Sequence, residues 1–443
     1  MKTKADVNID TTEYDFIIAG AGLYGAVMAR ELTDECMKVL VIEKRDHIGG
    51  NCYTEEEDGI VVHKCGPHIF HTNDEEVWRY VNRFADFIEF RNRPLAVYKD
   101  ERYPLPIDMS TFEALWGVTD PGEARRIIRA QTEAAGLAGK EPGSLEEQAV
   151  SMVGTELYEK LIKGYSEKQW GRSCSELPAS IIKRLQVSFG YADSYYPDRY
   201  QGIPAGGYTP MIERILDGIP VVLGKDHKSI LNGTEDHHGN GAVCNNTDYH
   251  ANPVSQRRNS DQQYRGPKII YTGSIDEYYG YCLGRLGYRS VRFEEEYIYG
   301  ITAYQDRAVI NHTDADVPYT RVTEHKYFDP GLPAFKKDFT IITREYPQDL
   351  GNKYSEHIDP LRDPEEHKSM HPVKSEKDPE PMYPVRSDAD LRLYERYRKL
   401  AEEDNEYVFF GGRLGTYRYM DMDDVIASAI GDARFLCKQA KEL

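Results

Sequence analysis

A glycine-rich turn near the N-terminus constrains the fold of this chain more than any other feature of its sequence. Gly20, Gly22 and Gly25 stand in a G-x-G-x-x-G pattern that follows an apolar, β-rich run at 14–19 and opens a segment of helical composition at 23–32. In this context the first glycine permits a tight turn, the second lets the backbone approach a pyrophosphate, and the third lets the helix pack closely on the strand. The N–H groups at the helix N-terminus then face the phosphates. The pattern therefore predicts a Rossmann-type dinucleotide site.

The residues after the next strand favour FAD as the dinucleotide. Glu43 ends a second apolar strand at 39–42, where a carboxylate accepts hydrogen bonds from a ribose 2′-hydroxyl and disfavours the 2′-phosphate of NADP. The extension from Glu43 to the glycine pair at 49–50 resembles that of the large FAD family that includes the amine oxidases, and glycines there allow close approach to the flavin side of the cofactor. We expect FAD to contact Gly20, Gly22, Gly25, Glu43, Lys44, Arg45, Gly50 and Asn51.

A chain of 443 residues is too long for one ordinary core, so two or three domains are expected. Helical periodicity runs through 123–135 and 144–162, and strands are expected at 268–271, 289–296, 308–311, 340–344 and 407–410, before a helix at 422–443. These elements indicate an α/β protein with a Rossmann-like FAD-binding domain, a helical insert domain and an antiparallel-sheet domain. The expected segments are 1–90 for the first part of the FAD-binding domain, 91–190 for a mainly helical lid domain, 191–285 for the second FAD-binding part with a polar insertion at 225–266, 286–390 for the antiparallel-sheet domain, and 391–443 for the C-terminal FAD-binding part.

Composition narrows the range of partners. The formal net charge of −19 repels phosphate backbones, so we expect no nucleic-acid partner, and an anionic small ligand would need a local cluster of arginines. The seven cysteines are odd in number and widely spaced, which indicates free thiols and no metal site. No signal peptide or membrane-spanning stretch is recognisable. We therefore expect a cytoplasmic protein without membrane insertion.

Five further motifs are more specific than the glycine turn. They are Gly-Pro-His-Ile-Phe-His at 66–71, Gly-Tyr-Ser-Glu-Lys-Gln-Trp-Gly at 164–171, Pro-Tyr-Thr-Arg at 318–321, Tyr-Pro-Val at 383–385 and Gly-Arg-Leu-Gly-Thr-Tyr-Arg-Tyr-Met-Asp-Met at 412–422. Together and in this order they resemble the bacterial-type UDP-galactopyranose mutase family over nearly the whole chain. The N-terminal tail and the polar stretches at 225–266 and 348–380 fall outside the resemblance.

The resemblance implies interconversion of UDP-galactopyranose and UDP-galactofuranose, without net redox change, by a homodimer that needs reduced FAD. In that family N5 of the flavin attacks the anomeric carbon of the sugar, UDP leaves, and the sugar ring opens and closes again. A diphosphate leaving group gathers negative charge, which arginines stabilise. The resemblance assigns catalytic roles to Arg184, Arg321, Tyr419 and His68, substrate contacts to Tyr165, Trp170, Tyr195, Tyr383, Arg413 and Asp421, and a further flavin contact to Arg413.

Some alternatives stay open at this point. Gln186-Val187-Ser188 stands where the family often has Pro-Val-Arg, so one supporting positive charge is missing. The site residues have structural alternatives as well: ion pairing for the arginines, core packing for Trp170, a buried structural role for His68 and helix capping for Asp421. Which tyrosine of 191–196 faces the site is open too. At the level of function, the rivals are an FAD-dependent oxidoreductase of the amine-oxidase-like fold and a non-catalytic nucleotide-binding protein.

Overall fold

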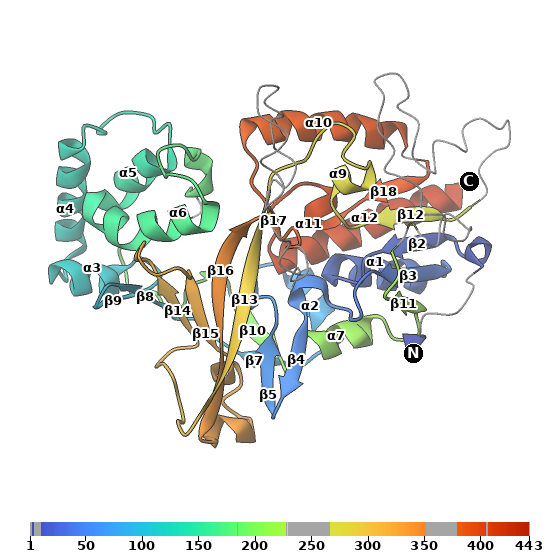
Figure 1. Cartoon of the computed structure of the whole chain (residues 1–443), viewed down its shortest axis with the longest axis horizontal. Coiled ribbons are helices and arrows are strands. Elements are labelled where there is room, and N and C mark those ends of the chain that lie inside the picture. Colours follow the sequence, from blue (N-terminus) through green and yellow to red (C-terminus); the bar gives the residue numbers. More distant parts are fainter. Residues whose placement is uncertain are drawn as a thin grey trace, which may run out of the picture.

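A computed structural model of the chain describes residues 2–3, 10–183, 185–226, 228, 266–350, 379–404 and 406–442. Most of the two polar stretches predicted at 225–266 and 348–380 lies outside these residues, as does Arg184. Figure 1 shows three parts: a lobe with both chain ends, a smaller helical lobe, and long strands between them. The protein is an α/β protein with a Rossmann-like domain, a helical insert and a largely antiparallel sheet.

A parallel sheet is the base of the Rossmann-like lobe. Its strand order is β1-β11-β3-β2-β12-β18, and every neighbouring pair is parallel. The strands are β1 (Lys2–Thr3), β2 (Phe16–Ala19), β3 (Val39–Glu43), β11 (Val221–Leu223), β12 (Lys268–Tyr271) and β18 (Val408–Phe410). Strands β2 and β3 are buried at every residue, as continuous apolar runs in a parallel sheet should be. The strands predicted in these regions are therefore confirmed to within two residues.

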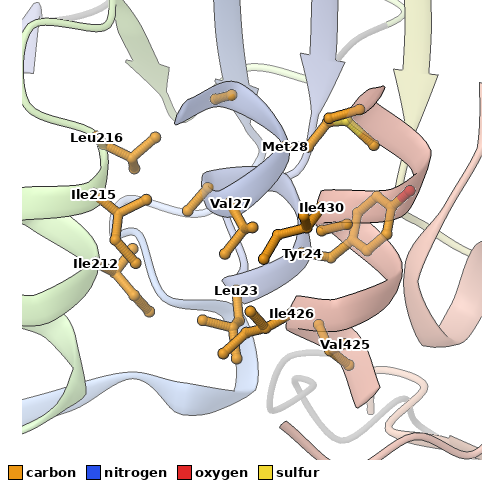
Figure 2. Packing of buried hydrophobic residues seen from close by; sticks show 14 of the residues in the cluster. Leu23, Tyr24, Val27, Met28, Ile212, Ile215, Leu216, Val425, Ile426 and Ile430 are labelled. Carbon is orange, nitrogen blue, oxygen red and sulfur yellow. The ribbon is translucent and has the colours of Figure 1, made fainter. Parts of the chain in front are cut away.

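The first helix of this lobe is fixed by packing on both of its sides. Figure 2 shows Leu23 and Val27 lying between Ile212 of one neighbouring helix and Ile426 of another. Each fully buried aliphatic side chain contributes roughly 1.5–3 kcal/mol to stability. The packing therefore holds the N-terminus of the first helix rigidly above the sheet. The three helices are α1 (Leu23–Asp34), α7 (Tyr208–Ile215) and α12 (Met422–Glu442).

The long strands between the lobes form a seven-stranded sheet with the order β17-β13-β16-β15-β14-β8-β9. The strands are β8 (Leu95–Tyr98), β9 (Glu101–Pro104), β13 (Tyr288–Tyr299), β14 (Val309–His312), β15 (Arg321–Glu324), β16 (Phe339–Asp349) and β17 (Tyr383–Pro384). The strands predicted at 289–296, 308–311 and 340–344 are confirmed as β13, β14 and β16. Two details of this sheet were not predicted: β8 and β9 come from the segment 91–190, and β14 pairs with β8 in parallel.

The helical lobe follows β9 directly. Its helices are α3 (Met109–Trp116), α4 (Pro121–Ala134), α5 (Leu145–Leu157) and α6 (Gly164–Trp170), with a π-helical turn at Tyr158–Lys163 before α6. Asp108, Asp120 and Ser144 cap the first three helices by accepting hydrogen bonds from first-turn N–H groups. The helices predicted at 123–135 and 144–162 are confirmed, and the second is kinked at Gly154, whose φ is +80°.

The remaining elements lie around these two sheets. A three-stranded antiparallel sheet has the order β6-β10-β7, and β4 pairs with β5 in a separate antiparallel hairpin. Among the described helices, none combines the length and the hydropathy that a membrane-spanning helix needs. The elements are β4 (Thr54–Glu57), β5 (Ile60–His63), β6 (Phe70–Thr72), α2 (Glu75–Val81), β7 (Phe87–Glu89), β10 (Tyr200–Pro204), α9 (Ile275–Tyr278), α10 (Asp388–Glu403) and α11 (Gly412–Gly415).

Candidate active site

Two of the three glycines in the turn between β2 and α1 have no room for a side chain. Gly20 has a φ of +120°, which favours glycine, and a Cβ on Gly25 would clash with the carbonyl oxygen of Gly20. The Cα of Gly22 lies 3.0 Å from where a Cβ on Gly50 would stand, so the two glycine loops touch through their backbones. Gly22 caps α1 without a side chain. The turn is therefore the bare backbone cradle that a diphosphate requires.

Glu43 is held at the end of β3 by both of its carboxylate oxygens. Oε2 accepts a hydrogen bond from the backbone N–H of Ala21 at 2.8 Å, and Oε1 accepts one from that of Arg45 at 2.9 Å. The side chain is 5% exposed, so these bonds form away from bulk water. The carboxylate is therefore fixed beside the glycine turn, at the position expected for a ribose contact.

Two cations beside Glu43 share one acidic partner. Nε of Arg45 donates to Glu380 at 3.0 Å, and Nζ of Lys44 lies 3.5 Å from the same carboxylate. Glu380 comes from the segment just before β17, which the sequence did not connect with the cofactor residues. A phosphate that enters here would compete with Glu380 for Arg45.

A cavity of about 410 Å³ opens at the carboxyl ends of β2, β3, β12 and β18, where open α/β sheets bind their ligands. It is lined by most of the predicted site residues: Gly20, Gly22, Gly25, Glu43, Lys44, Arg45, Gly50, Asn51, His68, Arg321, Arg413, Tyr419 and Asp421. Tyr165, Trp170, Tyr195 and Tyr383 do not line it. One cavity thus connects the glycine turn with Arg321.

Arg413 belongs to the lining of this cavity. It lies in α11, and its buried Nε has no hydrogen-bond partner among the described residues. Its guanidinium carbon stands 4.9 Å from the ring centre of Tyr419. A guanidinium with an unsatisfied N–H, on a residue that lines a cavity, fits an anionic or polar ligand group, so the residues present fit a bound dinucleotide.

Arg321 is placed by the register of three strands. Asn311 on β14 and Glu345 on β16 are directly opposite Arg321 on β15, so all three side chains lie on one face. Nε of Arg321 donates to Oδ1 of Asn311 at 3.2 Å, and Nη1 lies 3.4 Å from Oε2 of Glu345. Burial alone would lower the pKa of Arg321, but Glu345 and nearby tyrosines outweigh it and raise the pKa. Arg321 is therefore a permanently charged group beside the cavity.

The helix α6 brings Tyr165 to Arg321. Nη2 of Arg321 donates to the Tyr165 hydroxyl at 3.1 Å. Nζ of Lys168 lies 2.7–3.0 Å from four carbonyl oxygens, one at the end of β14 and three in the turn between β14 and β15. That turn leads directly into Arg321, so Lys168 fixes the helix and the arginine relative to each other. Lys168 belongs to the motif at 164–171, but spacing alone did not predict its role.

The C-terminal end of α6 contacts β17. Gln169 donates a hydrogen bond to the Tyr383 hydroxyl, and the rings of Trp170 and Tyr383 meet edge to face at 5.8 Å. Arg289 of β13 donates to the carbonyl oxygen of Gln169 at 2.9 Å. Tyr165, Trp170 and Tyr383 therefore form a group next to the cavity and not in its lining.

The sequence left open which tyrosine of 191–196 faces the site, and the structure places Tyr195 and Tyr196 differently. Tyr196 lines the cavity, and its ring stacks on His71 at 3.8 Å. Tyr195 lies outside the lining, but burial raises its pKa, and Tyr165, Arg321 and Tyr419 are close enough to act on it. Tyr196 was not predicted as a site residue, because neighbouring tyrosines in an irregular loop give no periodicity from which to choose.

His68 lies in the loop between β5 and β6 and lines the cavity. Burial lowers its pKa to about 4, and the charges of Arg413 and Arg321 act in the same direction. The ring is therefore neutral at pH 7. Of the described residues, none forms a cluster of three or more His, Cys, Asp and Glu side chains able to hold a metal ion.

Comparison with known proteins gives consistent matches. A family model described as UDP-galactopyranose mutase matches residues 160–419, and one described as an NAD(P)-binding Rossmann-like domain matches residues 18–84. A "probable UDP-galactopyranose mutase" of Klebsiella pneumoniae is 37% identical over 97% of this chain and 96% of that protein. A dTDP-fucopyranose mutase of Escherichia coli is 36% identical over 96% of this chain and 99% of that protein.

Solved structures show the same fold. A crystal structure of reduced UDP-galactopyranose mutase superposes with a TM-score of 0.65 at 14% identity and covers 97% of this chain and 94% of its own. A putrescine oxidase superposes with a TM-score of 0.52 at 14% identity and covers 96% of this chain and 99% of its own. At this identity the two structures support the architecture alone.

Proposed function

The chain belongs to the UDP-galactopyranose mutase family, and we propose that it interconverts UDP-galactopyranose and UDP-galactofuranose with reduced FAD as its cofactor. One observation carries the proposal: the glycine turn and Arg321 open into the same cavity. A dinucleotide on the turn and a diphosphate at the arginine would therefore be neighbours.

The residues divide into a cofactor end and a substrate end. The backbone N–H groups at the start of α1 would bind the FAD diphosphate, and Glu43 would accept from the adenosine ribose. When bound, reduced FAD supplies a nucleophile for the anomeric carbon of the sugar. Arg321 would hold the substrate diphosphate, whose negative charge rises as the bond to the sugar breaks.

Several neighbours of Arg321 would assist in binding. The Tyr165 hydroxyl already contacts Arg321, so both can meet the diphosphate together. We assign Tyr195, Tyr383, Tyr419 and Asp421 to the same substrate, and Trp170 to the cover over its base or sugar. Arg184, the second predicted diphosphate arginine, lies outside the described residues, and its role is part of the proposal.

A second candidate substrate follows from the comparisons. The Escherichia coli relative is named for dTDP-fucopyranose and matches this chain almost as well as the Klebsiella pneumoniae protein does. Both names describe a nucleotide-sugar mutase, so the two candidates share a reaction type and differ in base and sugar. Parallel turnover assays with the UDP and dTDP substrates separate them.

The test begins with the purified protein. A bound flavin gives visible absorbance, and dithionite should bleach it. Reduced enzyme should then convert UDP-galactofuranose to UDP-galactopyranose, followed by chromatography, without consuming an oxidant. Enzyme kept oxidised is the control and should be inactive. A colourless protein that rejects added FAD, or turnover that needs stoichiometric oxidant, would refute the proposal and favour a binding protein or an oxidoreductase.

The cellular compartment and the oligomeric state are also part of the proposal. The six described cysteines are all free thiols, which agrees with a reducing compartment such as the cytoplasm. A homodimer is expected from the family resemblance. Light scattering on a size-exclusion column tests the dimer directly.

A further inference from the structure

The loop that carries His68 is held through its main chain from two sides. The Tyr208 hydroxyl of α7 donates to the carbonyl oxygen of His68 at 3.0 Å, and the backbone N–H of His68 donates to Nδ1 of His63 at 3.1 Å. Tyr208 is 0% exposed and His63 is 1% exposed, and neither lines the cofactor cavity. The position of His68 is thus set from behind by two close-packed side chains.

A second buried histidine supports the first. The backbone N–H of His63 donates to Nδ1 of His325 at 3.3 Å, and Nε2 of His325 lies 2.7 Å from Oγ1 of Thr343. A backbone N–H can only donate, so Nδ1 of both imidazoles must be an unprotonated acceptor. Each neutral ring therefore carries its proton on Nε2, and His325 donates to Thr343.

His68 must adopt the opposite tautomer. Its Nδ1 lies 2.8 Å from the carbonyl oxygen of Gly66, which can only accept, so Nδ1 carries the proton. Nε2 of His68 is then an acceptor on a ring that lines the cavity. Burial lowers the pKa of His325 to about 3 and holds the pKa of His63 well below its ordinary value, which agrees with neutral rings at pH 7.

We propose that His63, backed by His325, is a positioning residue that fixes the main chain of His68 and keeps an unprotonated imidazole nitrogen on the cavity side. A proton on Nδ1 of His63 would set this N–H against the N–H of His68, whereas Nε2 of His63 is buried without a hydrogen-bond partner among the described residues in either tautomer. The hydrogen-bond order depends on side chains of this chain alone, and only its consequence for turnover rests on the proposed function.

The first experiment reads the tautomers directly. Full-length protein labelled with ¹⁵N-histidine is purified as expressed, and long-range ¹H–¹⁵N spectra of the imidazoles are recorded at pH 7. His68 should show the Nδ1–H form, whereas His63 and His325 should show the Nε2–H form. A His68 ring protonated on Nε2, or a charged His63, would overturn the proposal whether or not the protein is a mutase.

A matched pair of variants separates positioning from packing. In His63→Asn the side-chain oxygen stands near the place of Nδ1 and can still accept from the His68 N–H, whereas His63→Leu offers no acceptor. The His68 spectrum should stay in one tautomer with Asn and become an average of both with Leu. An unchanged His68 spectrum in His63→Leu would refute the proposal, and if that variant fails to fold, the wild-type and Asn spectra still decide.

Turnover provides the second readout. In the reduced holoenzyme, His63→Leu should lower kcat by about tenfold and leave KM for the sugar nucleotide nearly unchanged, because the substrate arginine is untouched. His63→Asn should restore most of kcat. A rise in KM without loss of kcat would assign His63 to substrate binding and contradict positioning. Absence of turnover in the wild type would count against the proposed function and leave the tautomer result intact.

Discussion

Replacing Gly25 with alanine tests whether the turn before α1 depends on close backbone contact. Gly25 lies in α1, and a Cβ there would clash with the carbonyl oxygen of Gly20. The same Cβ would stand 3.1 Å from the carbonyl carbon of Gly20 and 3.2 Å from Cγ2 of Ile18. The obstacle is backbone and a buried strand residue, neither of which can rotate away. Since α1 is also packed between α7 and α12, the helix must shift against its own core.

The magnitude follows from two opposing terms. Overpacking a well-packed site costs about 1–3 kcal/mol, and the upper end applies where backbone blocks the new methyl group. Alanine regains about 1 kcal/mol over glycine inside a helix. The net loss in Gly25→Ala is therefore about 2 kcal/mol, which lowers the melting temperature of a unit of roughly 200 residues by about 4–8 °C.

Gly431→Ala is the matched control. Gly431 also lies in a helix, α12, but a Cβ there meets no atom within 4 Å. The same substitution should therefore raise stability by about 0.5–1 kcal/mol. Thermal unfolding followed by circular dichroism, with FAD titrated into each variant, compares the two. A Gly25→Ala protein that melts at or above the wild type and binds FAD equally well would refute this account of the turn.

Three further predictions concern the site. Arg321→Ala should weaken UDP binding by about 2–4 kcal/mol in calorimetric titration, whereas Arg307→Ala, a change at an exposed position, should leave it unchanged. If the dissociation constant for UDP changes less than twofold in Arg321→Ala, Arg321 does not belong to the site. Glu43→Gln should cost about 1–3 kcal/mol in urea unfolding, because its amide nitrogen would face a backbone N–H, and an unchanged midpoint would contradict the two bonds described. Burial lowers the pKa of His325 to about 3 and that of His68 to about 4, from 6.5, so below pH 6.5 the unfolded chain binds protons that the folded chain excludes. The free energy of unfolding should therefore fall as the pH drops from 6.5 toward 4. A urea midpoint that stays constant over that range would contradict this prediction.

The cofactor end of the site could be predicted because its determinants are local. The glycines, the helix that they open and the strand that ends at Glu43 lie within one βαβ unit, so spacing alone relates them in space. Spacing did not predict the hydrogen bond from Ala21 to Glu43. It follows from parallel strands ending at the same edge of the sheet, which makes it predictable in principle.

The substrate end could not be built from the sequence in the same way. Arg321 owes its position to Asn311 and Glu345, which belong to separate strands and are joined only by register. The strand of Arg321 was not predicted as a strand, because its buried Thr323 and Glu324 hide the apolar pattern that marks strands. Family motifs placed Arg321 in the site, but its partners required the fold.

The charge of the chain and the charge of the cavity also differ, for a physical reason. The chain has 74 acidic and 55 basic residues, yet acidic and basic side chains are balanced in the cavity lining. The cations are Lys44, Arg45, Lys225, Arg321 and Arg413, and the carboxylates are Glu43, Asp226, Glu277, Glu380 and Asp421.

Salt screens the field of the distant surface over about 8–10 Å, whereas a buried guanidinium acts at contact and in a lower dielectric. Both oxygens of Glu43 are already used by backbone N–H groups, so this carboxylate opposes an anion less than its formal charge suggests. A chain with a strongly negative total can therefore bind a diphosphate, because the groups within contact distance set the affinity.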